Sequence, residues 1–444
     1  MANSKISNLY NYFTEKSIFV SYLIYLVTLL LCYINITVVE WDYYGFLMND
    51  TSLYKLFLFM IPSLLPLIVF KKYKAPSDFA MLTLWLTVLT GSSIVMPQVV
   101  QKELTTTIQW LYLVSFCLIG MTIICRKYYN QLITEKKNQF STTNIPKLVV
   151  PIFLIYGVSL SFYTLITLNF RFDISLETVY DRRLLARILV PDRSVFAYAL
   201  VLQQTVVIPF ICLIAASKRS LLLLLASIFF ASTTFALTGQ KSMVFQIIIT
   251  YIAYLLFKKN RSLSLAYITI IMSILCLSAF LEFKFFNTTD THNYLIRREV
   301  FIPGLLSSNY LDYFDETNFQ YFKESLTRFG VEQKELPIGR LIGLMYFQDA
   351  TTNANANIFA NGYANLGFSG VILSAALGIL VLCAINYLSM RVEHELSCIT
   401  CLWCGLKWID GSMHGSFLTG GIIFLMIGLI LINYYNAKQS TKAQ

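Results

Sequence analysis

Apolar residues form a series of long blocks that short polar segments separate. Many blocks reach about 18 residues or more, which is the length of an apolar helix that crosses a lipid bilayer. At about 20 residues for each crossing, the pattern predicts about twelve spans. They are expected near residues 18–36, 55–70, 78–98, 107–124, 148–168, 195–216, 221–238, 242–257, 264–285, 366–390, 397–413 and 417–435. The sequence therefore predicts an all-α polytopic membrane protein, with residues 1–444 forming a single integral membrane domain.

Composition strengthens this prediction and excludes a soluble class of protein. Of the 444 residues, 57% are hydrophobic and 13% are charged, whereas a soluble domain carries about 25% charged residues. The net charge of +10 fits basic loops that orient the chain and contact anionic lipid headgroups. No aromatic and basic motif for RNA or DNA accompanies it. We expect membrane lipids as partners and no nucleic acid.

Basic clusters in the short loops predict the orientation of the chain. They follow the second, fourth, sixth and eighth spans, and all fall on one side in this count. They comprise Lys71, Lys72, Lys74, Arg126, Lys127, Lys136, Lys137, Lys147, Lys218, Arg219, Lys258, Lys259 and Arg261. By the positive-inside rule that side is cytoplasmic, and both termini are cytoplasmic as well.

Two long hydrophilic segments, residues 169–194 and 286–365, fall on the opposite side. The first is a basic loop that contains five arginines and no lysine. These are Arg171, Arg182, Arg183, Arg187 and Arg193. Arginine offers a fixed fork of donors that binds phosphate in two-pronged fashion. The loop therefore fits an anionic ligand such as a lipid pyrophosphate, or an interfacial helix over Val179–Leu189 that acidic neighbours neutralise.

The second segment, residues 286–365, is the longest polar stretch of the chain. It opens with His292, Arg297, Arg298 and Glu299, and it carries Arg340 farther on. Its last part is rich in asparagine and glycine, and it offers many hydrogen-bonding groups. The candidates for substrate binding there are Asn355, Asn357, Asn361 and Tyr363. Alternatively, this last part binds no substrate and is a series of turns through which the chain re-enters the membrane at the next span.

Isolated charges also occur near predicted span ends. Lys241 follows Gly239 at the turn between two spans, on the side where the orientation rule disfavours a lysine. It either faces an anionic substrate or snorkels to the interface. Lys407, Asp410 and His414 are expected on one face of the 397–413 helix. Ionisable groups within a span usually face a cavity or a partner, although a Lys–Asp pair near the interface explains them equally.

The sequence gives little evidence for a metal site or for a nucleotide-binding site. The chain has only three histidines, and the C-x-x-C-x-x-C run at Cys398, Cys401 and Cys404 lacks a nearby fourth cysteine. No P-loop, serine elbow or dinucleotide fingerprint is present. We expect no metal and no cofactor.

Three stretches resemble the Wzy-type O-antigen and oligosaccharide repeat-unit polymerases of bacterial envelopes. They are TGQKSMVFQ, RREVFIPGLLSSNYLDYF and NANANIFANGYANLGFSGVI. The order of the spans, with one mid-chain basic loop and one large late loop, agrees over most of the chain. Some members carry an R-x10-G pattern in both loops. Arg328 and Gly339 have this spacing, whereas the 169–194 loop contains no glycine.

This resemblance implies a metal-independent glycosyltransferase of the bacterial inner membrane. It would polymerise undecaprenyl-diphosphate-linked repeat units of O-antigen or capsule type on the outer face, with a chain-length regulator as a possible partner. Cationic groups would stabilise the leaving diphosphate, and a base would accept a sugar hydroxyl proton. The catalytic candidates are Arg298, Arg297, Lys241, Arg340, Glu299, His292 and Asp410.

Three other classes stay open. An O-antigen ligase shares the topology and the lipid-diphosphate donor. A transporter, such as a flippase for lipid-linked oligosaccharides, is the second class. A flippase should carry its charges within the helical bundle and have short loops, whereas the charges of this chain concentrate in two large outer loops. A non-catalytic sensor or assembly subunit is the third class.

Overall fold

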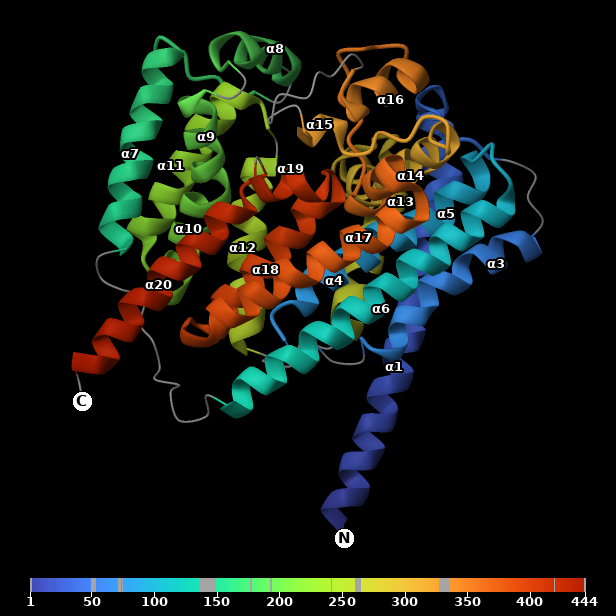
Figure 1. The fold of residues 1–444 in the computed structure, drawn as a ribbon, viewed down its shortest axis with the longest axis horizontal. Coiled ribbons are helices and arrows are strands. Elements are labelled where there is room, and N and C mark those ends of the chain that lie inside the picture. Colours follow the sequence, from blue (N-terminus) through green and yellow to red (C-terminus); the bar gives the residue numbers. More distant parts are fainter. Residues whose placement is uncertain are drawn as a thin grey trace. The chain divides into compact units, whose positions relative to one another are not determined.

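The chain is an all-α polytopic membrane protein (Figure 1). The computed structural model describes residues 2–48, 53–70, 73, 75–135, 149–175, 178–191, 194–240, 242–259, 265–326, 336–418 and 420–442. Every regular element within these ranges is helical. Eight described helices are long and apolar enough to cross a bilayer. They are Ser17–Glu40, Asp78–Val99, Leu104–Glu135, Val150–Thr167, Val195–Lys218, Leu221–Thr238, Leu265–Phe286 and Ile358–Leu388.

These eight helices lie where eight of the twelve spans were predicted. Shorter apolar helices occupy three further predicted spans, at Leu56–Ile68, Phe245–Leu255 and Ile422–Ile432. The remaining predicted span, the eleventh in chain order, is wrong in part. The helix expected over 397–413 ends at Ile409, and a new helix begins at Met413. Asp410, Gly411 and Ser412 separate the two, and such residues favour breaks over helix interiors. Lys407, Asp410 and His414 therefore do not share one helix face.

The described chain divides into two compact units. Unit 1 comprises Met1–Lys127, Ser262–Leu382 and Cys404–His414, and unit 2 comprises Tyr128–Arg261, Cys383–Trp403 and Gly415–Gln444. Helices α6, α17, α18 and α19 contribute residues to both units. The expected single membrane domain stays a prediction.

Unit 1 contains the N-terminal spans and the large hydrophilic segment. Its elements are α1 (Ala2–Cys32), η1 (Tyr33–Thr37), α2 (Val38–Glu40), η2 (Asp42–Tyr44), α3 (Leu53–Leu64), η3 (Leu65–Ile68), α4 (Asp78–Leu84), η4 (Trp85–Leu89), α5 (Thr90–Val99), most of α6 (Leu104–Glu135), α13 (Leu265–Phe286), η6 (His292–Phe301), α14 (Ile302–Tyr313), α15 (Lys323–Leu326), α16 (Ile338–Phe347) and most of α17 (Ile358–Leu388). The π-helices η1, η4 and η6 are wide turns, a geometry frequent at functional sites.

Unit 2 contains the mid-chain spans. Its elements are α7 (Val149–Thr167), α8 (Val179–Leu189), α9 (Val195–Leu202), η5 (Gln203–Val207), α10 (Ile208–Lys218), α11 (Leu221–Thr238), α12 (Ser242–Lys259), η8 (Ser389–Arg391), most of α18 (His394–Ile409), most of α19 (Met413–Leu418) and α20 (Ile422–Lys442). Two buried glutamines of this bundle donate hydrogen bonds to neighbouring helices. Gln203 donates to Thr234 Oγ1 at 3.0 Å, and Gln246 donates to the Gln204 carbonyl at 2.8 Å, as an apolar solvent requires.

The span α4–η4–α5 forms the core of unit 1. In the most apolar stretch of this span 94% of the residues are buried, compared with 33% for α13. Two buried tyrosines of α1 dock on it, since Tyr22 hydrogen-bonds Thr90 at 2.9 Å and Tyr25 donates to the Leu86 carbonyl at 2.9 Å. The Thr90 hydroxyl also donates to the Trp85 carbonyl at 2.8 Å. It thereby satisfies a carbonyl that belongs to the wide turn η4.

η6 and α14 follow each other without a break in the helical backbone, because Phe301 and Ile302 at their junction are both in the right-handed helical region. η6 begins beside the end of η1, with His292 Nε2 3.0 Å from Thr37 Oγ1. Near this junction, Gly304 approaches the backbone of Gly91 so closely that a Cβ would lie 2.8 Å from the Gly91 carbonyl. α14 then runs outward along α5 and ends where the Asp312 carboxylate accepts backbone N–H groups of Gln101 and Lys102. The segment expected to be a polar loop therefore returns into the helical core.

A tight hairpin lies within α17. Its backbone leaves the helical region at Leu366 and Gly367, and the φ of Gly367 is +60°. Gly362 and Gly370 then lie back to back, because a Cβ at either one would overlap the carbonyl group of the other. The predicted turn-rich re-entry is thus a short helix followed by a hairpin into the long span.

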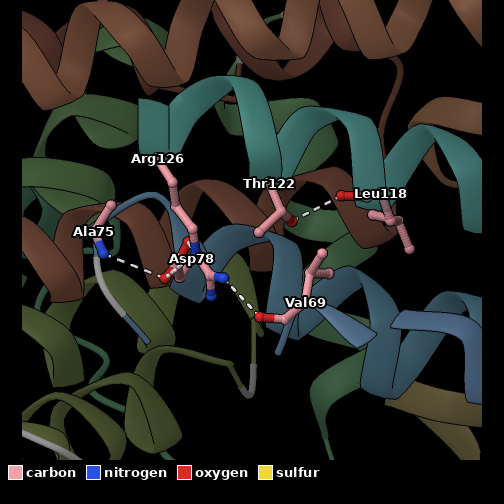
Figure 2. Close-up of polar contacts among 6 residues, drawn as sticks. All are labelled: Val69, Ala75, Asp78, Leu118, Thr122 and Arg126. Atoms are coloured by element: carbon pink, nitrogen blue, oxygen red, sulfur yellow. Dashed lines mark hydrogen bonds and ion pairs between the residues drawn. The ribbon is translucent and has the colours of Figure 1, made fainter. Parts of the chain in front are cut away.

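An ion pair fastens the start of α4 to α6 (Figure 2). Arg126 Nε lies 2.9 and 3.0 Å from the two carboxylate oxygens of Asp78, and Arg126 Nη1 donates to the Val69 carbonyl at 2.6 Å. Asp78 also accepts the Ala75 backbone N–H. The Asp78 side chain is 2% exposed and that of Arg126 is 11% exposed. This buried ion pair and its hydrogen bonds connect α6, the start of α4 and the backbone around Val69, all within unit 1.

Candidate functional site

The tandem arginines lie on η6, and the preceding turn is fixed by one carboxylate. Glu282, in the last turn of α13, accepts the backbone N–H of Asp290 at 2.9 Å and that of Thr291 at 3.2 Å. These N–H groups precede the first turn of η6, where helix donors have no partner within the helix. Glu282 thus sets the direction in which η6 leaves α13.

Arg297 is held by aromatic rings and an amide. Its guanidinium carbon lies 4.8 Å from the Trp41 ring centre and 5.4 Å from that of Tyr44. Its Nε and Nη2 both donate to Asn293 Oδ1, at 3.0 and 2.7 Å. Cation–π contacts favour the charged form and fix the plane of the guanidinium. We call Trp41, Tyr44 and Asn293 the Arg297 cage.

His292 lies behind this cage and is completely buried. Its ring stacks on Trp41 with 5.1 Å between centres and an interplanar angle of 12°. Burial, with a smaller contribution from the Arg297 charge, lowers the pKa of His292 to about 3. The imidazole is therefore neutral near pH 7. These contacts suit a residue that positions Trp41 and Arg297 better than one that touches a substrate.

Arg298 and Glu299 form the accessible part of η6. Their side chains are 51% and 43% exposed, and Arg298 Nε lies 4.0 Å from Glu299 Oε1. Lys407, in the last turn of α18, and Asp410, directly after that helix, belong to unit 1 and act electrostatically on Glu299. We call Arg298, Glu299, Lys407 and Asp410 the charged cluster.

The surroundings of Glu299 change its acidity. Burial is the largest cause and the Asp410 charge adds to it, so that the pKa of Glu299 rises to about 7 although Arg298 and Lys407 oppose the rise. Protein atoms around the carboxyl disfavour its charged form, although 43% of the Glu299 side chain is exposed to solvent. Carboxyls with a pKa near neutrality are favoured as acids and bases in catalysis.

The basic loop of unit 2 contains a different kind of arginine site. The predicted helix over Val179–Leu189 is confirmed as α8, which crosses the end of α11 (Figure 1). Arg182 is buried and donates to the backbone carbonyls of Asp173 and Ser175, and its guanidinium lies 4.5 Å from the Phe235 ring centre. Arg183 Nε donates to the Gly239 carbonyl at 3.3 Å. Two segments that the sequence marked separately, the basic loop and the turn at Gly239, are therefore in contact.

Replacement of Arg182 by alanine is expected to destabilise unit 2 by about 2 kcal/mol, because hydrogen bonds from a charged donor to buried carbonyls are lost. Arg182→Lys should restore little, since one ammonium cannot reach the same carbonyls with the geometry of a guanidinium. Thermal unfolding of the purified protein in detergent measures the effect. The matched control is Arg187→Ala on the exposed face of the same helix, and equal unfolding temperatures for both variants would contradict the structural role of Arg182.

The outward face of α8 is apolar and basic. Leu184, Leu185 and Ile188 are 58%, 43% and 76% exposed, and Arg187 lies exposed among them. A short helix with this pattern suits the headgroup level of a bilayer. Arg171 is also exposed on the loop before α8. Of the five arginines of the loop, Arg187 and Arg171 are thus free of the internal contacts that engage Arg182 and Arg183.

The asparagine-rich segment is engaged mainly in holding its own fold. Asn357 is buried, accepts the N–H groups of Phe359 and Ala360, and donates to Ser307 Oγ at 2.8 Å. Asn361 is 8% exposed and contacts Asn365. Tyr363 is 5% exposed and packs edge to face against Phe319 and Phe368. Asn355, the fourth candidate for substrate binding in this segment, is exposed, and so is the catalytic candidate Arg340.

Lys241 and Arg193, also predicted as site residues, lie outside the described residues. The same holds for Arg328 of the R-x10-G spacing. Within the described ranges, no group of three or more His, Cys, Asp or Glu residues could hold a metal ion.

The structure thus brings together Arg297, Arg298, Glu299 and Asp410 at one end of unit 1 and places His292 behind them. The cage residues Trp41, Tyr44 and Asn293 were not predicted from the sequence. Their signal was the W-D-Y-Y run directly after the first span, which suits a membrane interface equally well. No protein-family model, curated protein or solved structure matches this chain.

Proposed function

We propose that this protein polymerises undecaprenyl-diphosphate-linked oligosaccharide repeat units, of O-antigen or capsule type, on the outer face of a bacterial inner membrane. The observation that carries the proposal is the charged cluster beside the Arg297 cage. It unites accessible cationic groups with a carboxyl whose pKa lies near 7. The resemblance to Wzy-type polymerases, which includes the arginine-led segment of η6, points to the same chemistry.

The proposed reaction is a glycosyl transfer. A sugar hydroxyl of one lipid-linked repeat unit attacks the anomeric carbon of the glycan on a second lipid, and the bond from that carbon to the diphosphate breaks. The departing diphosphate gains negative charge in the transition state. Fixed cationic donors stabilise this charge best when they are positioned before the reaction begins.

Arg297 and Arg298 fit two different parts of this task. Arg297 is already oriented by its cage, so little side-chain entropy is lost when it binds an anion. Arg298 is half exposed and has only the 4.0 Å contact to Glu299 as its ion pair among the described residues. It is therefore able to turn toward a diphosphate, and we assign it the larger share of charge stabilisation.

The helix α8 fits the membrane-bound nature of such a substrate. Its exposed leucines and isoleucine suit the acyl boundary, and Arg187 suits anionic headgroups at the same depth. The proposal also includes membrane lipids and a chain-length regulator as partners.

The deciding experiment is a gene deletion in the native host, complemented with wild type or with Arg298→Ala, followed by gel analysis of the surface glycan. We expect the deletion to reduce the glycan ladder to a single repeat unit. Arg298→Ala should leave it there, because loss of one positioned donor lowers the rate about 100-fold or more. Immunoblots of membranes check that the variant is inserted normally.

The control is Lys284→Ala, an exposed cation in the last turn of α13, which should restore the full ladder. Complete loss of the surface glycan on deletion, including the single-unit band, would indicate a ligase or a flippase instead. An unchanged ladder in the deletion strain would refute the proposal.

A further inference from the structure

The charged cluster contains more than the cations that the proposed reaction needs. Glu299 adjoins Arg298 in the chain, its oxygen lies 4.0 Å from that guanidinium, and its side chain is accessible. Lys407, in the last turn of α18, and Asp410, in the break after that helix, act on it electrostatically. One carboxyl therefore lies next to the arginine that we assign to the diphosphate and is influenced by one further charge of each sign.

We infer that Glu299 accepts the proton of the attacking sugar hydroxyl, and that Asp410 and Lys407 are positioning residues that tune it in opposite directions. This assignment rests on the proposed function. The sequence alone gave no reason to prefer Glu299, Asp410 or His292 as the base, and this assignment chooses among them.

Geometry excludes His292 from direct contact and favours Glu299 over Asp410. His292 has no accessible surface, and its Nε2 is engaged with Thr37. Asp410 is exposed in the break between α18 and α19 and does not share a helix with the two arginines. Glu299 belongs to the same helix as both arginines, so a sugar whose diphosphate contacts Arg298 brings its reacting carbon near this carboxylate.

The proposed step is balanced in atoms and charge. The hydroxyl oxygen of the acceptor sugar forms a bond to the anomeric carbon of the donor, and the hydroxyl proton moves to a Glu299 oxygen. The bond between that carbon and the diphosphate oxygen breaks, and its electron pair leaves with the diphosphate. Glu299 then releases its proton to water, and no metal or further reactant takes part in this step.

The tuning has a definite sign. A base acts in its unprotonated form, so the rate should rise with pH through the pKa of Glu299, which surrounding protein and Asp410 raise to about 7. Arg298 and Lys407 lower this pKa. Removal of the Asp410 charge should therefore move the acid limb of the rate profile to lower pH, and removal of the Lys407 charge should move it to higher pH.

The test uses the purified full-length protein in detergent or nanodiscs. The substrate is the lipid-linked repeat unit extracted from a host strain that lacks the gene. Rates are measured from pH 5 to pH 9 for wild type and for Glu299→Gln, Asp410→Asn and Lys407→Gln. Glu316→Gln, an exposed acidic residue in a turn of unit 1, serves as the control, and thermal unfolding checks that each variant is folded.

We expect Glu299→Gln to lose 100-fold or more in kcat with little change in KM. Asp410→Asn and Lys407→Gln should shift the acid limb by roughly one pH unit each, downward and upward respectively, whereas Glu316→Gln leaves it in place. A folded Glu299→Gln protein with near wild-type kcat, or shifts of both tuning variants in the same direction, would overturn the assignment while polymer formation by wild type upholds the proposed function. Absence of any polymer from wild type would overturn both.

Discussion

Replacing Gly91 with alanine will lower the free energy of unfolding by roughly 3 kcal/mol, because an added methyl group meets backbone that cannot move freely. A Cβ at Gly91 would overlap the carbonyl group of Val300, the residue that follows Glu299 in η6. Relief of this overlap requires the continuous helical segment of η6 and α14 to shift away from α5. We therefore expect Gly91→Ala to lose both stability and the glycan ladder.

The matched control is Gly120→Ala in α6, where no atom lies within 4 Å of the added Cβ. It should be neutral or slightly stabilising, since alanine favours a helix over glycine. Thermal unfolding in detergent and the surface glycan gel are the measurements. If Gly91→Ala unfolds at the same temperature as Gly120→Ala, the close packing of η6 on α5 is incorrect.

Replacing Arg126 with alanine should cost about 3–5 kcal/mol, because it leaves the buried carboxylate of Asp78 without its partner. The Val69 carbonyl loses its donor as well, and the segments around Ala75 and Val69 lose their link to α6 (Figure 2). We expect a large drop in the unfolding temperature and reduced amounts of the protein in membranes.

A double variant, Asp78→Asn with Arg126→Met, separates charge from packing. It should be more stable than Arg126→Ala alone, because no unpaired charge remains buried. The control is the exposed neighbour Lys127→Ala, for which a change within about 0.5 kcal/mol is expected. A double variant that is less stable than Arg126→Ala would contradict the view that the unpaired carboxylate causes the loss.

The sequence predicted the spanning helices and α8 well because both depend on local composition. Long apolar blocks fix the spans, and the amphipathic pattern of residues 179–189 fixes α8. The cluster of Arg298, Glu299 and Asp410 was predicted only as a set of separate candidates. Their proximity depends on how η6 and the end of α18 pack, which no local pattern encodes.

The burial of α14 escaped prediction for a related reason. α14 carries a proline, two serines and an asparagine among its apolar residues, so its composition matches that of a surface loop. Its burial follows from small residues, namely Gly91, Gly304 and Ser92, that let backbones meet. The role of Asn357 was also hidden, because an asparagine that caps a helix and one that binds a sugar look identical in a sequence.

The same limit applies to Arg126 and Asp78. The sequence assigned Arg126 to a cytoplasmic cluster that orients the chain, and 48 positions separate it from Asp78. A pair so distant becomes visible only after the helices are packed.

The wide turns of η6 have a consequence for how this segment can change over time. His292 and Arg297 are five residues apart and both contact Trp41, whereas in an ordinary α-helix residues three or four apart share a face. A one-residue deletion in η6 would rotate Arg298 and Glu299 relative to the aromatic rings even if every other residue were kept. Descendants of this gene should therefore tolerate many substitutions in the segment but almost no change in its length.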